Sequence, residues 1–260
     1  MSADRYEFAV ALAKKAGELG VSYFRRLETL TVTSKGHQDM VSEADRDVET
    51  LVRDELAKVF PDDGILGEEH GRIAGTSGYT WVIDPIDGTA NFVAGIPQWC
   101  VIIACVYQGE TVIGVIHDPV AGETFHALRG KGAFLGDRPI SVSDSDSLSR
   151  GSLGVGFNGR TKPADVVECV SQLLAAGGVF FRNASGGLML AYTAAGRLIG
   201  YIEPHMNAWD CLAGLLMIEE AGGKVEPFDV DKSLDVGTRI VCGGPGIYDA
   251  AKTIADSSFS

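Results

Sequence analysis

"WVIDPIDGTANF", residues 81–92, places two acids at the end of an apolar stretch. Residues 81–83 have the side chains that the interior of a β-sheet prefers. Asp84 and Asp87 do not fit there as free charges, because burying an unpaired carboxylate is very costly. Pro85 disfavours a helix at the residue before it and fixes its own φ angle. We therefore expect a sharp turn where the strand ends, with both carboxylates pointing to the same place.

The residues after this turn suggest a ligand. Gly88 allows the backbone to come close to a bound group, and Thr89 can begin a helix whose free N–H groups favour an anion. The alternative, which needs no ligand, is a strand-end turn held by hydrogen bonds from the aspartates.

Further acids occupy comparable positions. Glu68 follows a short strand-like stretch, Asp210 opens a predicted helix, and Asp45 lies three residues after Ser42. Each has an ordinary explanation by itself: a solvated loop acid, a helix N-cap and a capping box. Together with the two acids of the opening stretch, they form the pattern of a carboxylate cage for hard cations.

Magnesium fits such a cage because it prefers oxygen ligands, keeps several waters and is often shared with a substrate phosphate. Two ions roughly 3.5–4 Å apart can hold the attacking and leaving oxygens of a displacement reaction. The sequence therefore predicts a Mg²⁺ site in which bound cations offset the charge of the acids.

Composition limits the partners. The 260 residues are 45% hydrophobic, enough for one large domain or two joined lobes, and 33 glycines are too many for a helical bundle. Acids outnumber Lys and Arg by 35 to 22, so the formal net charge is −13. Such a surface repels a polyphosphate backbone, which argues against nucleic acid as the main partner. A phosphorylated substrate would be repelled too, unless cations reversed the local field.

Nothing in the sequence predicts a membrane partner. The N-terminal residues lack the apolar segment of a signal peptide, and the longest apolar run, residues 99–107, is too short to span a bilayer. The five cysteines show no CxxC pair and are expected to be reduced, mostly buried thiols. These features predict a cytoplasmic protein.

Periodicity predicts two kinds of organisation along the chain. Up to residue 142 we expect two amphipathic helices at 4–26 and 42–60, three short strands at 29–34, 65–66 and 79–83, and two hairpins at 99–117 and 123–142. From residue 143 on, strands alternate with helices at 164–176, 186–195 and 208–221. We therefore predict an N-terminal α+β lobe, residues 1–142, with most metal ligands, and a C-terminal α/β lobe, residues 143–260, that completes the site.

The motifs resemble those of a known family. "WVIDPIDGTANF", "GEE" and "WDCLAG" look like the three signatures of the inositol monophosphatase family of magnesium-dependent, lithium-sensitive phosphatases, and "KGHQDMVSEAD" and "EEAGGKVEPF" match further family segments. The resemblance covers nearly the whole chain. It implies a layered αβαβα sandwich of the inositol monophosphatase and fructose-1,6-bisphosphatase type, a homodimer, and hydrolysis of a small phosphorylated polyol or amino alcohol, with inositol-1-phosphate favoured.

The resemblance also implies roles for particular residues. Two or three Mg²⁺ ions would be held by Glu68, Asp84, the carbonyl of Ile86, Asp87 and Asp210. Catalysis would involve Glu68 together with Thr89, which pairs with Asp45 to orient the attacking water. The substrate would contact the amides of Gly88 and Thr89, the polyol pocket at Ser185, Gly186 and Gly187, and the carboxylates of Glu203 and Asp210.

Two departures and several alternatives accompany this resemblance. The family often has two threonines where this chain has Thr89-Ala90, and commonly Gly-Thr/Ser-Ala at 185–187, so the identity of the alcohol is open. A histidinol-phosphate phosphatase, a broad-specificity sugar or nucleotide phosphatase, and a regulatory binding protein that keeps the fold are alternatives. "GVGFNG", residues 154–159, fits GxGxxG, but the next strand ends in Arg182 and Asn183 rather than in the acid that a dinucleotide site expects.

Overall fold

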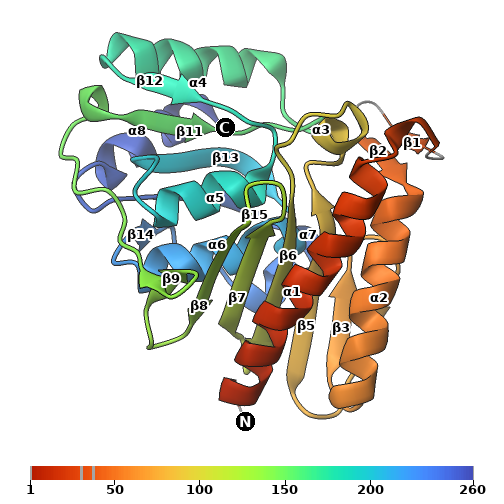
Figure 1. Cartoon of the computed structure of the whole chain (residues 1–260). Helices are drawn as coiled ribbons and strands as arrows, with labels where there is room; N and C mark the ends of the chain where they lie inside the picture. Colours follow the sequence, from red (N-terminus) through yellow and green to blue (C-terminus); the bar gives the residue numbers. More distant parts are fainter. Residues whose placement is uncertain (1, 30–31, 37–38, 260) are drawn as a thin grey trace.

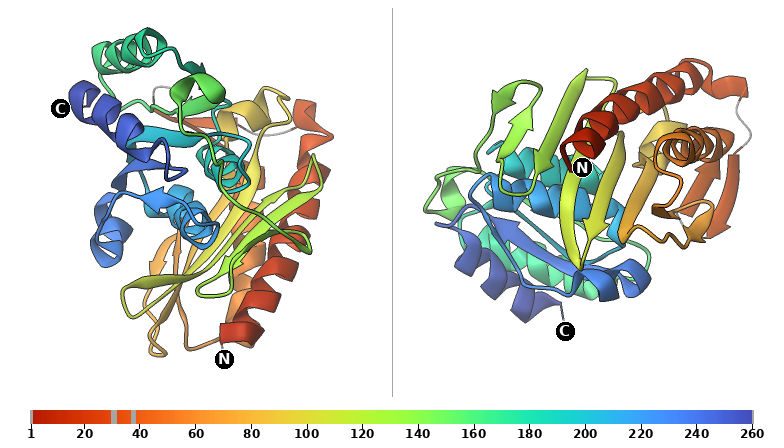
Figure 2. Two further views of the ribbon diagram at one scale, coloured as in Figure 1. Left: turned by 90° about the vertical axis from the view of Figure 1, so that its left-hand side faces the viewer. Right: turned by 90° about the horizontal axis from the view of Figure 1, so that it is seen from below.

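The computed structural model describes residues 2–29, 32–36 and 39–259. Its elements form layers in which helices alternate with β-sheets (Figures 1 and 2). Outer helices, a large sheet, central helices, a small sheet and further outer helices follow one another. This order confirms the predicted αβαβα sandwich.

The large sheet has the strand order β10-β9-β8-β7-β6-β5-β3-β4. β3 and β5 are parallel, and the other neighbours are antiparallel. Its strands are β3 (Gly64–Gly67), β4 (Gly71–Ile73), β5 (Tyr79–Asp87), β6 (Cys100–Tyr107), β7 (Glu110–Asp118), β8 (Glu123–Leu128), β9 (Ala133–Leu135) and β10 (Arg138–Pro139). The predicted hairpins at 99–117 and 123–142 are thereby confirmed.

The small sheet has the order β12-β11-β13-β15-β14. Its strands are β11 (Ser152–Val155), β12 (Val179–Phe181), β13 (Gly200–Met206), β14 (Lys224–Val225) and β15 (Thr238–Gly243). A separate hairpin joins β1 (Val32–Gly36) and β2 (Asp39–Ser42). It overlaps the segment "KGHQDMVSEAD", in which His37 and Gln38 lie outside the described residues.

The helices take up the faces of these sheets. α1 (Ser2–Phe24) and α2 (Glu43–Val59) cover one face of the large sheet, while α5 (Gly186–Ala194) and α6 (Ala208–Glu220) lie between the sheets (Figure 1). The remaining helices are α3 (Thr89–Val93), α4 (Pro163–Ala175), α7 (Val230–Val236) and α8 (Tyr248–Ser258), of which α4 and α8 cover the outer side of the small sheet. Each predicted helix is present.

The strands of the large sheet alternate between two cores, as the two-residue period of a strand requires. Trp81 and Ile83 pack into the core beneath α1 and α2. Val82 packs into the other core, which contains α5 and α6. Because both faces of β5 are covered, its apolar residues are buried throughout, and the opening stretch is read correctly as a sheet interior.

The end of β5 differs from the prediction. We expected the strand to stop before Asp84, but it continues to Asp87, with Asp84 opposite Ile102 and Asp87 opposite Cys100. β5 therefore has one extra residue here, which is a β-bulge. Pro85 lies inside the bulge, where its missing N–H removes no required ladder bond.

The predicted division into lobes at residue 143 stays a prediction. The strands of the large sheet end at Pro139 and those of the small sheet begin at Ser152. However, α5 and α6 pack against strands of both sheets and share one core with them. All five cysteines lie within the described residues and are buried and free, as expected. In the described ranges, no helix is both long and apolar enough to cross a membrane.

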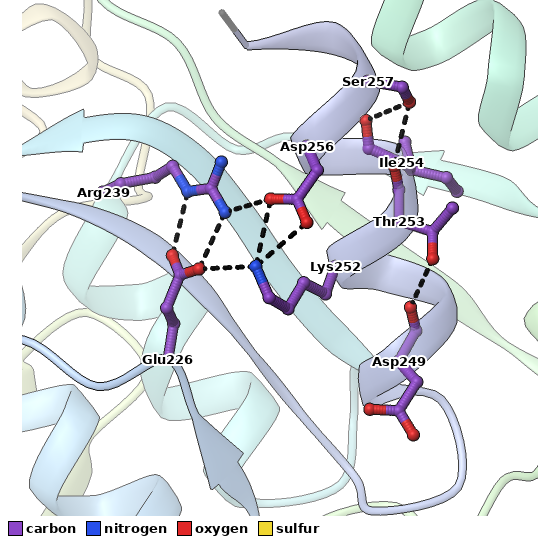
Figure 3. Close-up of polar contacts among 8 residues, drawn as sticks. All are labelled: Glu226, Arg239, Asp249, Lys252, Thr253, Ile254, Asp256 and Ser257. Atoms are coloured by element: carbon purple, nitrogen blue, oxygen red, sulfur yellow. Dashed lines mark hydrogen bonds and ion pairs between the residues drawn. The ribbon is translucent and has the colours of Figure 1, made fainter.

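A charged network ties α8 to the edge of the small sheet (Figure 3). Arg239 donates from Nε to Glu226 Oε2 at 2.9 Å and from Nη2 to Glu226 Oε1 at 2.7 Å. Lys252 Nζ of α8 donates to Glu226 Oε1 at 2.9 Å and to Asp256 at 3.0 Å. The hydrogen bond from Arg239 lowers the pKa of Glu226. The network therefore joins three segments of the C-terminal region.

Asp63 is a second polar group that joins separate elements. Its carboxylate accepts two hydrogen bonds of 2.8 Å from Arg5 of α1, one of 3.0 Å from Trp81 Nε1 and one of 2.6 Å from Ser77. Burial by itself would raise the pKa of Asp63, but these hydrogen bonds lower it below its ordinary value. The group links α1 to the interior of the large sheet.

Replacing Asp63 with Ala should destabilise the protein by about 3–5 kcal/mol, because Arg5 and the Trp81 N–H lose their partner in a buried site. The control is Asp146→Ala, whose pair with Arg150 is exposed, and we expect a change within about 0.5 kcal/mol. Because the pKa of Asp63 is lowered on folding, its contribution is present at neutral pH and is lost as the pH falls below about 4. Urea unfolding at pH 7 and pH 3.5 measures both effects; equal losses in the two variants would contradict this role.

Candidate active site

Most of the predicted site residues line one cavity of about 780 Å³. Residues of the large sheet and its following helix, at the end of β5 and the start of α3, form one part of its lining. The other part comes from the segment after β11, the residues that lead into α5, the strand β13 and the start of α6. The lining residues are Glu68, Asp84, Ile86, Asp87, Gly88, Thr89, Ala90, Val155, Gly156, Phe157, Asn158, Gly159, Arg160, Arg182, Ala184, Ser185, Gly186, Met189, Tyr201, Glu203, Met206, Asn207 and Asp210. Of the predicted site residues, Asp45 and Gly187 are absent from this described lining.

Three carboxylates form the floor of this cavity. Asp84, Asp87 and Asp210 each offer an oxygen, and these atoms all lie within 4.8 Å of one another. This grouping confirms the expectation that Asp84 and Asp87, at the end of β5, point to one place. The fold brings Asp210 of α6 to the same place. Glu68 lines the cavity but is outside this group of three among the described residues.

Mutual repulsion and burial act on the protonation of this group. Burial raises the pKa of Asp84 well above its ordinary value, and the charges of Glu68, Asp87 and Asp210 raise it further. Burial and the charge of Asp87 raise the pKa of Asp210 to about 7. Within the described residues, no Lys or Arg forms an ion pair with the three aspartates. The floor thus concentrates negative charge that the protein itself does not neutralise.

Asp87 is held by the start of α5. Ser185 Oγ donates to Asp87 Oδ2, the amide of Gly187 donates to the same oxygen at 2.8 Å, and the amide of Gly186 donates to Oδ1 at 3.2 Å. Burial raises the pKa of Asp87, and these hydrogen bonds act in the opposite direction. The residues 185–187 therefore position an acid of the floor, a role that we did not predict; their place in a polyol pocket stays a prediction.

Asp210 is not the N-cap that we considered. Asn207 is the N-cap of α6, and Asp210 is its third helical residue. Asp210 Oδ2 accepts a hydrogen bond of 3.1 Å from the Asn207 amide and one of 3.2 Å from its side chain. This half of a capping box uses one oxygen and orients the carboxylate.

Thr89 and Asp45 form the predicted pair. Thr89 Oγ1 lies 3.1 Å from Asp45 Oδ1 and 3.0 Å from the carbonyl oxygen of Ile86. Ile86 is fully buried and is one of the residues that line the cavity. α2 begins at Glu43, and the side chain of Ser42 lies outside the described residues, so the capping alternative for Asp45 stays a prediction.

Glu49 of α2 holds the turn that carries Glu68, and it was missed in the sequence. The fully buried Glu49 carboxylate accepts from the amides of Glu69 at 2.7 Å and His70 at 3.1 Å, and from Arg53 Nε at 2.7 Å. A Cβ at Gly67 would overlap the Glu49 carboxylate, so glycine is required there. Glu49 lies one helical turn after Asp45, which is a signal in the sequence, but nothing in it identifies the backbone amides that Glu49 binds.

Glu203 lies on β13 at the cavity wall, where Tyr201 donates a hydrogen bond to its Oε2. Burial raises the pKa of Glu203 to about 8. A Cβ at Gly156 would overlap both Glu203 Oε2 and the Tyr201 hydroxyl. This close approach gives a packing reason for a glycine of the GxGxxG segment and removes the need for a dinucleotide.

The chemistry of the cavity floor suits a hard cation. Its donors are carboxylate and carbonyl oxygens, without the Cys and His ligands that favour zinc. Burial and the charges of neighbouring acids raise the pKa values of Asp84 and Asp210, and a divalent ion would supply an opposite charge. The predicted ligands therefore fit magnesium.

Comparison with known proteins agrees with this geometry. The model of the inositol monophosphatase family matches residues 1–258. A Nus factor SuhB of Xylella fastidiosa is 41% identical over 84% of this chain and 80% of its own length, and an inositol-1-monophosphatase of Rhizobium meliloti is 40% identical over 92% and 91%. The crystal structure of the extragenic suppressor protein suhB from Bartonella henselae superimposes with a TM-score of 0.89 at 35% identity, over 95% of this chain and 96% of that one. The chain, with its layered sandwich and acidic cavity, belongs to the inositol monophosphatase family.

Proposed function

We propose that this protein is a Mg²⁺-dependent phosphate monoester hydrolase whose favoured substrate is an inositol monophosphate. The observation that carries the proposal is the group of three carboxylates within 4.8 Å of one another, in a cavity that Thr89, the partner of Asp45, also lines. Membership of the family and the relative named inositol-1-monophosphatase support it.

The cations have a defined place in this proposal. Asp84, Asp87 and Asp210 would hold Mg²⁺, and Glu68 and the Ile86 carbonyl would complete the ligand set of two or three ions. When bound, such ions supply positive charge to a phosphate and lower the pKa of a water molecule. Hydrogen bonds from Ser185 and Gly187 keep the carboxylate of Asp87 in place before the substrate arrives.

Thr89 would orient the attacking water. Its hydroxyl has one proton, which can go to Asp45 Oδ1 or to the Ile86 carbonyl. When it donates to Asp45, its oxygen lone pairs are free to accept a proton of a water molecule in the cavity. Asp45, which is 1% exposed, thereby acts through Thr89 to hold and move a proton.

The substrate is proposed to extend from this point across the cavity. The amides of Gly88, which is left-handed with φ 94°, and Thr89 would receive the phosphate. Glu203, at the wall of the cavity, would accept hydrogen bonds from hydroxyls of the alcohol. Contacts to hydroxyl groups are the only feature of this wall that favours a polyol phosphate over histidinol phosphate, which is an amino alcohol ester. Histidinol phosphate and a broader range of substrates are therefore the alternatives to test.

A non-catalytic role is the second candidate. Several relatives, including one that is 41% identical, are named Nus factor SuhB. The word factor in this name favours a binding role for the present protein as the second candidate. A purely regulatory protein would not need the carboxylate floor and the Thr89–Asp45 pair, and both are present. The net charge of −13 argues against direct contact with nucleic acid. A homodimer and a cytoplasmic location also stay proposals.

Phosphate release should depend on Mg²⁺. We expect the purified protein to hydrolyse inositol-1-phosphate with Mg²⁺, to stop after EDTA and to recover when the ion is restored, because the acidic floor otherwise repels the phosphate dianion. Lithium should inhibit, as in the family that the chain resembles. A panel that adds histidinol phosphate, fructose-1,6-bisphosphate and adenosine bisphosphate separates the alternatives. Full turnover in EDTA after thorough metal removal would contradict the metal-dependent mechanism.

Asp210→Asn should separate metal binding from helix capping. Asparagine can still accept the hydrogen bond of the Asn207 amide, so we expect the melting temperature to be retained, whereas turnover should fall by about 10- to 100-fold with a raised Mg²⁺ requirement. The matched control is Asp229→Asn, which changes the N-cap of α7 outside the cavity and should leave turnover unchanged. Parental turnover of Asp210→Asn at low Mg²⁺ would make Asp210 purely structural.

Glu49→Gln should weaken cation binding although Glu49 is not in the cavity lining. Glutamine has one acceptor oxygen instead of two, so the turn that carries Glu68 loses part of its support, and Arg53 loses its charged partner. We expect a stability loss of about 3 kcal/mol and a several-fold higher half-saturating Mg²⁺ concentration. The control on the same helix, Glu55→Gln, only removes exposed pairs with Lys15 and Lys58. An unchanged Mg²⁺ titration of folded Glu49→Gln would show that Glu49 does not position Glu68.

A further inference from the structure

A buried thiol contacts one acid of the cavity floor. Cys100 is the first residue of β6, is fully buried, and is not among the described residues that line the cavity. It lies opposite Asp87 in the antiparallel pairing of β5 with β6. Because directly opposed residues of an antiparallel pair point to the same face of a sheet, the thiol and the carboxylate come together. Cys100 Sγ donates to Asp87 Oδ2 over 3.5 Å.

The β-bulge at the end of β5 makes this contact possible. Asp84 lies opposite Ile102 and Asp87 opposite Cys100, so three steps along β5 match two steps along β6. In a regular strand, residues three positions apart point to opposite faces. The extra residue of the bulge therefore turns Asp87 to the face of Asp84, where Cys100 and Ile102 pack into the core that contains α5 and α6.

The thiol binds the same carboxylate oxygen as the start of α5. Asp87 Oδ2 accepts from Ser185 Oγ and, at 2.8 Å, from the Gly187 amide. Cys100 Sγ also lies 3.7 Å from Ser185 Oγ. Among the described residues, Asp87 Oδ1 accepts only the 3.2 Å hydrogen bond of the Gly186 amide. A carboxylate oxygen has two lone-pair sites, so three donors occupy Oδ2 fully and Oδ1 is the oxygen left for a cation.

Gly187 leaves room for the thiol. A Cβ at this position would lie 3.0 Å from Cys100 Sγ and 3.1 Å from Asp87 Oδ2. It would also lie 2.5 Å from Cδ1 of Ile102 on β6. Glycine therefore allows the start of α5 to come so close to β6 that a backbone amide and a thiol hold the same oxygen.

We propose that Cys100 is a positioning residue for the cation site: its thiol and the start of α5 together hold Oδ2 of Asp87, so that Oδ1 faces the cation. The inference rests on the proposed function in one respect, namely that Asp87 is a Mg²⁺ ligand. Cys100 lies outside the cavity lining and acts through Asp87 alone. Hydrogen bonds to a ligating carboxylate fix its orientation and thereby its affinity for the ion.

The test separates the hydrogen-bond donor from the volume of the side chain. Mg²⁺ binding is measured by calorimetric titration of the parent, Cys100→Ala, Cys100→Ser and the control Cys105→Ala. Cys105 is a second fully buried thiol on β6, and it packs into the other core, beneath α1 and α2. We expect Cys100→Ala to raise the Mg²⁺ dissociation constant by about threefold, below the roughly 10- to 100-fold cost of losing stronger supporting bonds, because a thiol is a weak donor. Cys100→Ser, which keeps a donor, and Cys105→Ala should bind Mg²⁺ like the parent.

Three results would overturn the positioning role. They are parental Mg²⁺ affinity in folded Cys100→Ala, an equal loss in Cys100→Ala and Cys100→Ser, and an equal loss in Cys105→Ala, which would make the effect one of core packing. Urea unfolding reports whether each variant is folded. If Cys100→Ala does not fold, Cys100→Val takes its place, because valine fills the space without a donor.

Phosphate release from inositol-1-phosphate by the same proteins tests the proposed function separately. A parent that binds Mg²⁺ without releasing phosphate would contradict the proposed function, and the titrations would still decide the role of Cys100. A parent that releases phosphate, with Mg²⁺ affinity unchanged in Cys100→Ala, would contradict the positioning role alone. Absence of Mg²⁺ binding by the parent would reject both.

Discussion

Repulsion among buried carboxylates is the constraint to which the centre of this structure is adapted. One carboxylate oxygen each of Asp84, Asp87 and Asp210 lies within 4.8 Å of the others. Burial raises the pKa of all three, and the charges of neighbouring acids raise those of Asp84 and Asp210 further. Such a group is tolerated only where hydrogen bonds, protons or cations offset its charge. The protein supplies hydrogen bonds to the individual acids, and their shared charge is the feature from which we propose a cation site.

The layered fold provides this compensation through its central helices. The first residues of α5 bind Asp87, and the N-cap residue of α6 binds Asp210. Backbone N–H groups at helix starts are fixed dipoles, so they stabilise negative charge without reorganising. Because α5 and α6 pack against both sheets, the geometry of the acidic floor depends on the packing of the whole sandwich.

The cavity is lined by groups of both charges. Carboxylates come from β5, β13 and α6, and Arg160 and Arg182 come from the segments after β11 and β12. Glycine at 67 and 156 allows this arrangement, since a Cβ at either position would overlap a carboxylate oxygen.

The sequence by itself determined the elements and most of the acids. Trp81 and Val82 pack into different cores because successive residues of a strand point to opposite faces, and Asp84 and Asp87 are close in sequence, so local rules place them. The tertiary structure alone decided that β5 continues through a bulge, that Ser185–Gly187 bind Asp87, and that Glu49 holds the turn of Glu68. These contacts join backbone amides to side chains about 20 to 100 residues away, and such partners follow from how the layers pack, which local periodicity does not encode.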